Sequence, residues 1–371
     1  MTGAVYSAHV RGRSIAKRYR RLHDYLIDLA RLKRVPVEKA YRIIGIDSSP
    51  YTVKVRAFMR YKRILHQWVA RMPQFFEETQ DMRPLLMPVV QFPDGNYHID
   101  STPIMRQLDG LHGADRSVCP ASAALAFLND LIEDFADEWL TKSLFHYRFS
   151  TAVDSAFGAS WVMDDCYPSL DAASLKAHVE DFTKRQHERR ELIGCTPVNA
   201  TLFEACFADL VDSLEGWVAT DRFLFGSRPA SADFALYGQL RTLSIDPTPA
   251  TLMRARTPRL RHWLGRVDDL SGAQGHWLSV EAALPRVEPL LVLCGRYYLP
   301  FLQANFNAIS GGKETVQVDF GGHLYKQAPF RYQAKCYAQL AAAYEALPEA
   351  ARVHLVAVLE RTGCASFLPD A

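Results

Sequence analysis

Three short segments between residues 41 and 112 constrain the fold of this chain more than any other part of it. The first is an apolar strand that leads into Ser49-Pro50 and a helix. The second is Met87-Pro88 at the start of another apolar strand, and the third is Asp100-Ser101 at the start of another helix. Serine before proline is typical of a helix N-terminus, as is an Asp-Ser pair. The order predicts a small mixed α/β layer with two helix N-termini beside a strand.

These segments also predict the kind of ligand that would bind there. The backbone N–H groups at a helix N-terminus attract a carboxylate, and an aspartate at the same place suits an adjacent amino group. Pro88 removes a ladder donor, and a cis bond before it would leave the N–H and C=O of Val89 free at the strand edge. The expected ligand is therefore anionic and peptide-like, held by Pro88, Val89, Asp100 and Ser101.

The bulk properties exclude several classes of function. The chain has 371 residues, with 43 basic and 41 acidic side chains, so its charge gives no reason to expect a nucleic-acid partner or a membrane surface. Its seven cysteines are scattered and lack the spacing of a disulfide framework or a metal site. No apolar run reaches the roughly 20 residues of a spanning helix. We expect a cytoplasmic protein without a bound metal.

The remainder of the chain divides by pattern into further regions. Residues 1–40 carry ten basic residues against three acidic ones and predict a helical arm. Apolar stripes at helical spacing dominate residues 113–290 and predict an all-helical bundle domain. Residues 291–371 predict an extension that contains a β-hairpin over 315–326 and two helices over 332–347 and 350–361.

Taken as a set, the three segments resemble the glutathione-binding side of the glutathione S-transferase family in order and spacing. The resemblance continues at Phe223–Phe234, which is similar to the family's segment before a buried helix, with Asp233 as its capping residue. Ala230 departs from the Ser or Thr usual there, and Ser231 is a partial substitute. The resemblance covers residues 41–290, and the tail looks like that of a bacterial subgroup of long transferase-like proteins.

The resemblance implies a fold, a ligand and a chemistry. The fold would be a thioredoxin-like α/β domain over residues 41–112, followed by the helical domain, in a mostly α protein. Glutathione would bind the first domain, and Ser49 would donate a hydrogen bond to its sulfur and favour the thiolate. Tyr51 and Ser48 remain alternatives for this hydroxyl. Family members with thioredoxin-type chemistry carry Cys where Ser49 and Thr52 stand, so a dithiol redox role is disfavoured.

A small electrophile is the expected second substrate, and the helical region over 121–150 is its expected binding surface. The polar and aromatic candidates on that surface are Asp137, Trp139, His146, Tyr147 and Arg148. Lys62, Gln67 and Arg71 are alternatives for the group that holds the glycine carboxylate of glutathione. The family resemblance implies a homodimer, although the tail could cover the dimer face instead. A glutathione-dependent lyase, dehalogenase or isomerase, and a non-catalytic binding protein, are the alternative functions.

Overall fold

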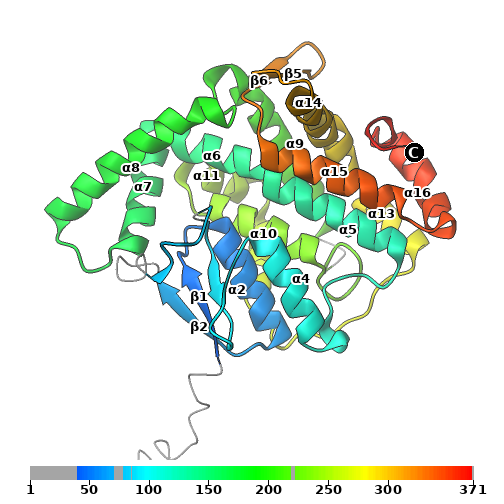
Figure 1. The fold of residues 1–371 in the computed structure, drawn as a ribbon, viewed down its shortest axis with the longest axis horizontal. Helices are drawn as coiled ribbons and strands as arrows, with labels where there is room; N and C mark the ends of the chain where they lie inside the picture. The colour runs from blue at the N-terminus through cyan, green and yellow to red at the C-terminus, as the bar shows by residue number, and fades with distance from the viewer. Residues whose placement is uncertain (1–39, 71–77, 85, 219–221, 370–371) are drawn as a thin grey trace, which may run out of the picture.

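The computed structural model describes residues 40–70, 78–84, 86–218 and 222–369. The predicted basic arm, apart from residue 40, lies outside the described residues, and so does Arg71. Figure 1 shows a small sheet with two helices beside it at the lower left and a larger helical body above and to the right.

The N-terminal part is a four-stranded mixed sheet with the order β2-β1-β3-β4. Its elements in chain order are β1 (Tyr41–Gly45), α2 (Pro50–Lys62), β2 (His66–Ala70), β3 (Val89–Gln91), β4 (Tyr97–Ile99) and α4 (Ser101–Leu111). β1 and β2 are parallel, whereas β3 is antiparallel to both β1 and β4. The sequence predicted β1, α2, β3 and α4, whereas the mixed residues HQWVA of β2 give no clear strand pattern.

The helical region begins after a short 3-10 turn, η2 (Ala114–Arg116). Its long elements are α5 (Ala123–Phe135), η3 (Ala136–Leu140), α6 (Thr141–Ser150), α7 (Ala152–Cys166), α8 (Ala172–Leu192), α9 (Ala200–Trp217), α10 (Ser231–Leu243), α11 (Pro247–Arg256) and α12 (Pro258–Val267). A second 3-10 turn, η4 (Pro197–Asn199), precedes α9. α7 and α8 pack against each other and reach out at the upper left of the molecule (Figure 1). The predicted helical domain is confirmed.

The C-terminal extension, residues 291–369 in the structure, starts inside a helix. α13 (Val280–Leu293) continues through the π-helical turn η5 (Cys294–Tyr298) into α14 (Leu299–Ser310). The rest is the hairpin β5 (Val316–Asp319) and β6 (Leu324–Gln327), followed by α15 (Arg331–Glu345), α16 (Glu349–Arg361) and η6 (Ala365–Phe367). The predicted hairpin and both closing helices are confirmed. α15 lies along α5 and α14 (Figure 1).

α2 packs very closely against α10 of the helical region. A Cβ on Gly238 of α10 would lie 2.5 Å from the carbonyl oxygen of Pro50, so only glycine fits there. A Cβ on Gly45 would similarly lie 2.4 Å from the Thr52 side chain. These contacts fix the N-terminus of α2 relative to both β1 and the helical body.

The first turn of α10 is capped by its own Asp233 and by Asn129 of another helix, α5. The carboxylate of Asp233 accepts hydrogen bonds from the backbone N–H groups of Ala230 and Leu224, as the capping prediction requires. Ser231 does not substitute for the missing cap, because its hydroxyl donates to Glu133. The side-chain oxygen of Asn129 on α5 instead accepts from the Ala232 N–H at 3.0 Å.

A buried lysine joins the α/β part to the helical region. Lys54 of α2 is 1% exposed, and its Nζ lies 2.6 Å from both Glu133 on α5 and Asp137 on η3. Nζ also donates to Thr102 of α4 at 3.1 Å. Burial lowers the pKa of Lys54, but the two carboxylates outweigh that effect and the net shift is upward. This network therefore links four elements, α2, α4, α5 and η3, through the charge of Lys54.

Carboxyl groups also join the extension to this region. Tyr298 of η5 donates to Asp134 at 2.7 Å, and Gln333 of α15 donates to Glu138 at 3.2 Å. Burial raises the pKa of Asp134 to about 7 and that of Glu138 to about 8. Glu138 belongs to the π-helical segment η3, and Asp134 to the end of α5 just before it.

We expect Lys54→Met to destabilise the protein by about 3–5 kcal/mol, because two carboxylates then remain buried without a counter-ion. The deficit should shrink as the pH falls and these carboxylates take up protons. Urea unfolding at pH 7.5 and pH 5.5 measures both effects. Lys176→Met is the control, since Lys176 is exposed on α8 and pairs only weakly with Glu180. Equal effects of the two substitutions would contradict the structural role given to Lys54.

Glu138→Gln should flatten the pH dependence of stability. The folded state holds the Glu138 proton up to about pH 8, whereas the unfolded chain releases it near the usual pKa. The unfolding free energy of the parent therefore falls as the pH rises through this interval. Thermal unfolding between pH 5 and 8.5 should show a smaller fall for Glu138→Gln. An unchanged profile, equal to that of the surface variant Glu180→Gln, would refute this assignment.

Candidate functional site

The three predicted segments meet at one edge of the sheet. Ile44, Val89 and Ile99 lie in one row across β1, β3 and β4. The same register places Gly45, Pro88 and Asp100 in the next row, where the strands meet the loop to α2, the Met87-Pro88 bond and the start of α4. Neighbouring strands are about 4.8 Å apart, so this row is about 10 Å long. A stretched tripeptide has about the same length.

Ser49 caps α2 and keeps its own proton available. Its Oγ accepts from the backbone N–H of Thr52 at 3.4 Å, and Pro50 follows at the first helical position. Among the described residues, no acceptor lies within hydrogen-bond distance of the Ser49 hydroxyl as a donor. The first turn of α2 contains no acidic residue, so the positive end of the helix dipole is not neutralised locally.

The two alternative hydroxyls already serve structural contacts. Ser48 donates to Asp165 of α7 at 2.7 Å, and its carbonyl accepts from Arg148. Tyr51 donates to the carbonyl oxygen of Asp137 at 2.8 Å, and burial raises the pKa of Tyr51 well above its usual value. Neither group is therefore free in the way that the Ser49 hydroxyl is.

The Met87-Pro88 peptide bond is cis, but Val89 does not lie at an open edge. It belongs to β3, with Ile44 of β1 on one side and Ile99 of β4 on the other. The prediction of free backbone groups at Val89 is wrong, because the hairpin after Asp94-Gly95 folds β4 over that edge. Met87, just outside the strand, makes no main-chain hydrogen bond with any other described residue.

Asp100 and Ser101 occupy the start of α4 as predicted, with an unusual backbone. Asp100 has φ 74° and ψ 116°, a region that residues other than glycine rarely adopt. Its carboxylate does not cap α4; it accepts a hydrogen bond from the Tyr332 hydroxyl of the extension at 2.8 Å. Ser101 is 5% exposed. Strain of this kind in a surface-facing loop is characteristic of ligand sites.

The residues expected to hold an electrophile do not line an open surface. Asp137, Trp139, His146, Tyr147 and Arg148 are all buried. Arg148 forms a buried ion pair with Asp246 at 2.9 Å, and Trp139 lies in the core. Their helical spacing could not reveal this, because the covering elements, α10 and the extension, come from distant parts of the sequence.

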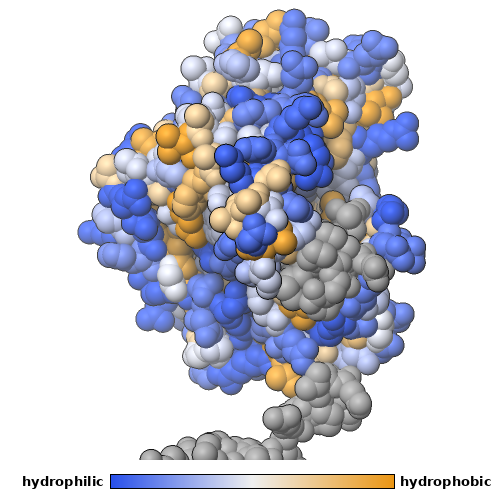
Figure 2. All heavy atoms as spheres, turned by 90° about the vertical axis from the view of Figure 1, so that its left-hand side faces the viewer, coloured by the Kyte–Doolittle hydropathy of each residue, from blue (hydrophilic) through white to orange (hydrophobic). Residues whose placement is uncertain are grey.

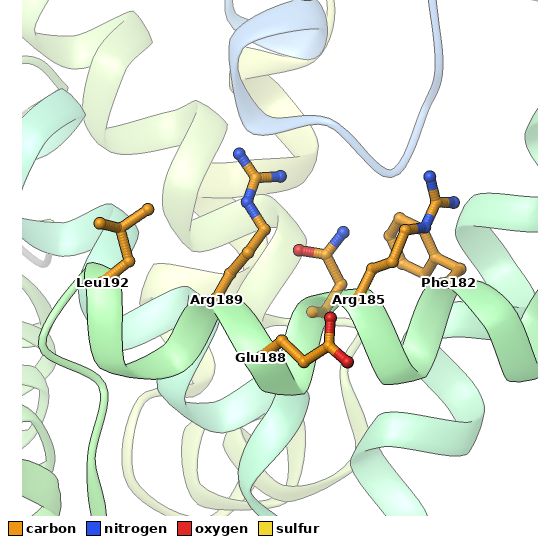
Figure 3. Close-up of a pocket in the computed structure, with 6 residues that line it drawn as sticks. Phe182, Arg185, Glu188, Arg189 and Leu192 are labelled. Carbon is orange, nitrogen blue, oxygen red and sulfur yellow. The ribbon is translucent and has the colours of Figure 1, made fainter.

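A cavity on α8 lies beside the candidate site instead. It has a volume of about 540 Å³ and is lined by Phe182, Arg185, Gln186, Glu188, Arg189 and Leu192. In Figure 3, Arg185 and Arg189 point to the same side of α8, toward the chain of the N-terminal part. Phe182 packs against the apolar cluster that contains Ile46 and Met87. Figure 2, which views this side of the molecule, shows a largely hydrophilic surface with small apolar patches.

The residues predicted as alternatives for binding the glycine carboxylate of glutathione differ in their availability. Lys62 is buried and committed, since its Nζ lies 2.8 Å from Asp109 and donates to the Gly113 carbonyl. Gln67 is partly exposed on β2, an edge strand. Arg185 and Arg189 could not be predicted from the sequence, because a single charge-rich helix shows no sign of which of its residues face a neighbouring loop.

The described residues show neither a metal site nor a membrane-spanning helix. No group of three or more His, Cys, Asp or Glu side chains in this part of the chain is placed to hold a metal ion. None of the helices that the structure describes has both the length and the apolar character to cross a membrane.

Comparison with known proteins finds similarity only at the level of structure. No family model and no curated protein sequence matches the chain. The β-etherase LigF from Sphingobium sp. strain SYK-6 is 18% identical, with a TM-score of 0.44, over 62% of this chain and 95% of that one. A GST-like protein from Pseudomonas syringae is 19% identical, with a TM-score of 0.41, over 67% and 74%. A glutathione S-transferase from Methylobacillus flagellatus with GSH bound is 18% identical, with a TM-score of 0.37, over 62% and 96%.

The topology of the described residues itself identifies the fold. A β-α-β unit with parallel strands is followed by an antiparallel hairpin and a helix, and then by a helical domain. The described residues thus have the predicted thioredoxin-like layer followed by a helical domain, and the chain adds a C-terminal extension to them.

Proposed function

We propose that this protein is a glutathione transferase that binds glutathione along the row formed by Gly45, Pro88 and Asp100. The observation that carries the proposal is the register of the sheet, which brings Pro88 and the strained Asp100-Ser101 helix start into one row with Gly45, shortly before the uncommitted Ser49 hydroxyl in sequence. Fold alone does not define an activity, so the argument rests on these groups and their chemistry.

The two ends of the row suit the two ends of the tripeptide. The N–H groups that begin α4 would hold the α-carboxylate of the γ-glutamyl group, and the Asp100 carboxylate would hold its ammonium. Because Val89 is enclosed, the main chain of Met87 takes its place as the partner of the cysteinyl residue.

Ser49 would then act on the sulfur. A thiol of pKa about 8.5 is mostly protonated at neutral pH, and a hydrogen bond from a hydroxyl together with a helix N-terminus favours its thiolate. The thiolate would attack an electrophilic carbon, so that a carbon–sulfur bond forms and the leaving group departs with the bonding electrons. The thiol proton passes to solvent at the end of the strands where the row of Gly45, Pro88 and Asp100 lies.

The cavity on α8 supplies space for the electrophile. Phe182 at one end of the cavity and Met87 both pack against the apolar cluster around Ile46, which supports a position of the cavity on the same side as the proposed sulfur site. Within the described residues, Arg185 and Arg189 form no ion pair with an acidic side chain, although Glu188 also lines the cavity. The guanidinium groups favour an electrophile with an anionic substituent.

Titration calorimetry of glutathione into the purified protein tests the binding site. We expect a micromolar to low-millimolar Kd that rises about tenfold in Ser101→Ala, the loss expected for one hydrogen bond to a charged group. Ser122→Ala is the control, because Ser122 also lies at a helix N-terminus, as the residue before α5, and makes no capping bond. Absence of heat with the parent protein, together with an unchanged melting temperature, would refute the proposed ligand.

Ser49→Ala should lower turnover of a reactive electrophile by about 10²-fold, the typical effect of removing one donor from a developing anion. The substitution also removes a helix cap and should cost about 1 kcal/mol of stability. Ser49→Thr retains both the hydroxyl and the cap and should keep most of the activity. Ultraviolet absorbance of the bound thiolate against pH provides the direct measurement, and an equal thiol pKa in parent and Ser49→Ala would exclude this role.

A further inference from the structure

The C-terminal extension reaches the ligand edge of the sheet through one side chain. Tyr332 is the second residue of α15, and its hydroxyl donates to Oδ2 of Asp100 at 2.8 Å across 232 positions of sequence. Tyr332 is 38% exposed, so its ring borders the solvent side of the site and is not part of the core. The extension thus contacts the residue proposed to hold the ammonium of glutathione.

Contacts on both sides of Tyr332 hold it in place. The side chain of Asn305 on α14 is 0% exposed and makes two hydrogen bonds with the Phe330 backbone, at 2.8 Å to its N–H and 2.9 Å to its C=O. On the other side, Gln333 donates to the carboxyl group and to the backbone carbonyl of Glu138. The start of α15 is therefore anchored to α14 and η3.

Asp100 needs an external partner for its carboxylate. Its backbone has a positive φ, and its side chain makes no capping bond to the N–H groups of α4. Oδ2 accepts from Tyr332, while Oδ1 has no hydrogen-bond partner among the described residues. Burial and the negative charge of Asp100 raise the pKa of Tyr332, which keeps its hydroxyl protonated as a donor. One oxygen is fixed, and the other is open to a ligand.

We propose that Tyr332 is a positioning residue that fixes the Asp100 carboxylate, so that Oδ1 receives the α-ammonium group of the ligand. This inference rests on the proposed function and adds a specificity determinant to it. The extension completes the site from outside the thioredoxin-like layer. The site consequently selects peptides that carry a free amino group next to the carboxylate bound by α4.

Calorimetry with two ligands separates this role from a general structural one. The ligands are glutathione and its analogue in which hydrogen replaces the α-amino group. We expect Tyr332→Phe to weaken glutathione binding about 5- to 10-fold, as for one hydrogen bond to a charged group, and to leave binding of the analogue unchanged. Asp100→Asn should weaken glutathione binding further than Tyr332→Phe does. The double variant should bind no more weakly than Asp100→Asn alone, because the two residues act as one unit.

Tyr337→Phe is the matched control on the same helix, since the Tyr337 hydroxyl donates to the Phe367 carbonyl away from the site. It should bind both ligands as the parent does. Equal losses for both ligands in Tyr332→Phe would show a general structural role, and tighter glutathione binding would show that Tyr332 blocks Asp100; either result overturns the inference. If the parent protein does not bind glutathione at all, the proposed function itself fails.

Discussion

The buried charge of Lys54 is the constraint on which the relative position of the two parts of this protein depends. An ammonium group that is 1% exposed requires compensation within reach, and Glu133, Asp137 and Thr102 provide it from α5, η3 and α4. Lys54 lies little more than one helical turn after Ser49, so the network that satisfies the lysine also fixes the direction of the α2 N-terminus. The geometry of the candidate site therefore depends on the buried Lys54 network, which fixes the position of the α2 N-terminus.

The same packing decides which hydroxyl remains for chemistry. Ser48, Ser49 and Tyr51 lie within one turn of one another, and in the sequence the family resemblance, not a local pattern, favours Ser49 over the other two. The choice follows from tertiary contacts: Asp165 of α7 takes the Ser48 proton, and the Asp137 carbonyl takes that of Tyr51. Ser49 serves only as an acceptor toward its own helix. A hydroxyl that is fixed as an acceptor and free as a donor is oriented in advance for an incoming sulfur.

Local patterns predicted much of the fold because the responsible interactions are local. Ser49-Pro50 marks a helix start through side-chain capping, and Asp94-Gly95 marks a hairpin through the positive φ of Gly95, 90° in the structure. Val89 was misplaced because its exposure depends on where β4 folds back, which is a matter of pairing and not of its own residue type. Trp139 and Arg148 carry no sequence sign that α10 or the extension covers them. The contact between Tyr332 and Asp100 spans 232 positions and lies beyond any local pattern.

The polar contacts of the C-terminal extension serve to orient α15 more than to stabilise the fold. Burying a carboxyl group such as Asp134 or Glu138 is costly, and well-packed apolar side chains at the same positions would stabilise the fold at least as well. Their raised pKa values, about 7 and about 8, express that cost. Hydrogen bonds, however, are directional where apolar contacts are not. The bond between Gln333 and Glu138 fixes the rotation of α15 about its axis, and Tyr332, the adjacent residue, thereby meets Asp100 at hydrogen-bond distance. The hydrogen bond between Gln333 and Glu138 at the start of α15 is thus the structural condition for the neighbouring contact between Tyr332 and Asp100.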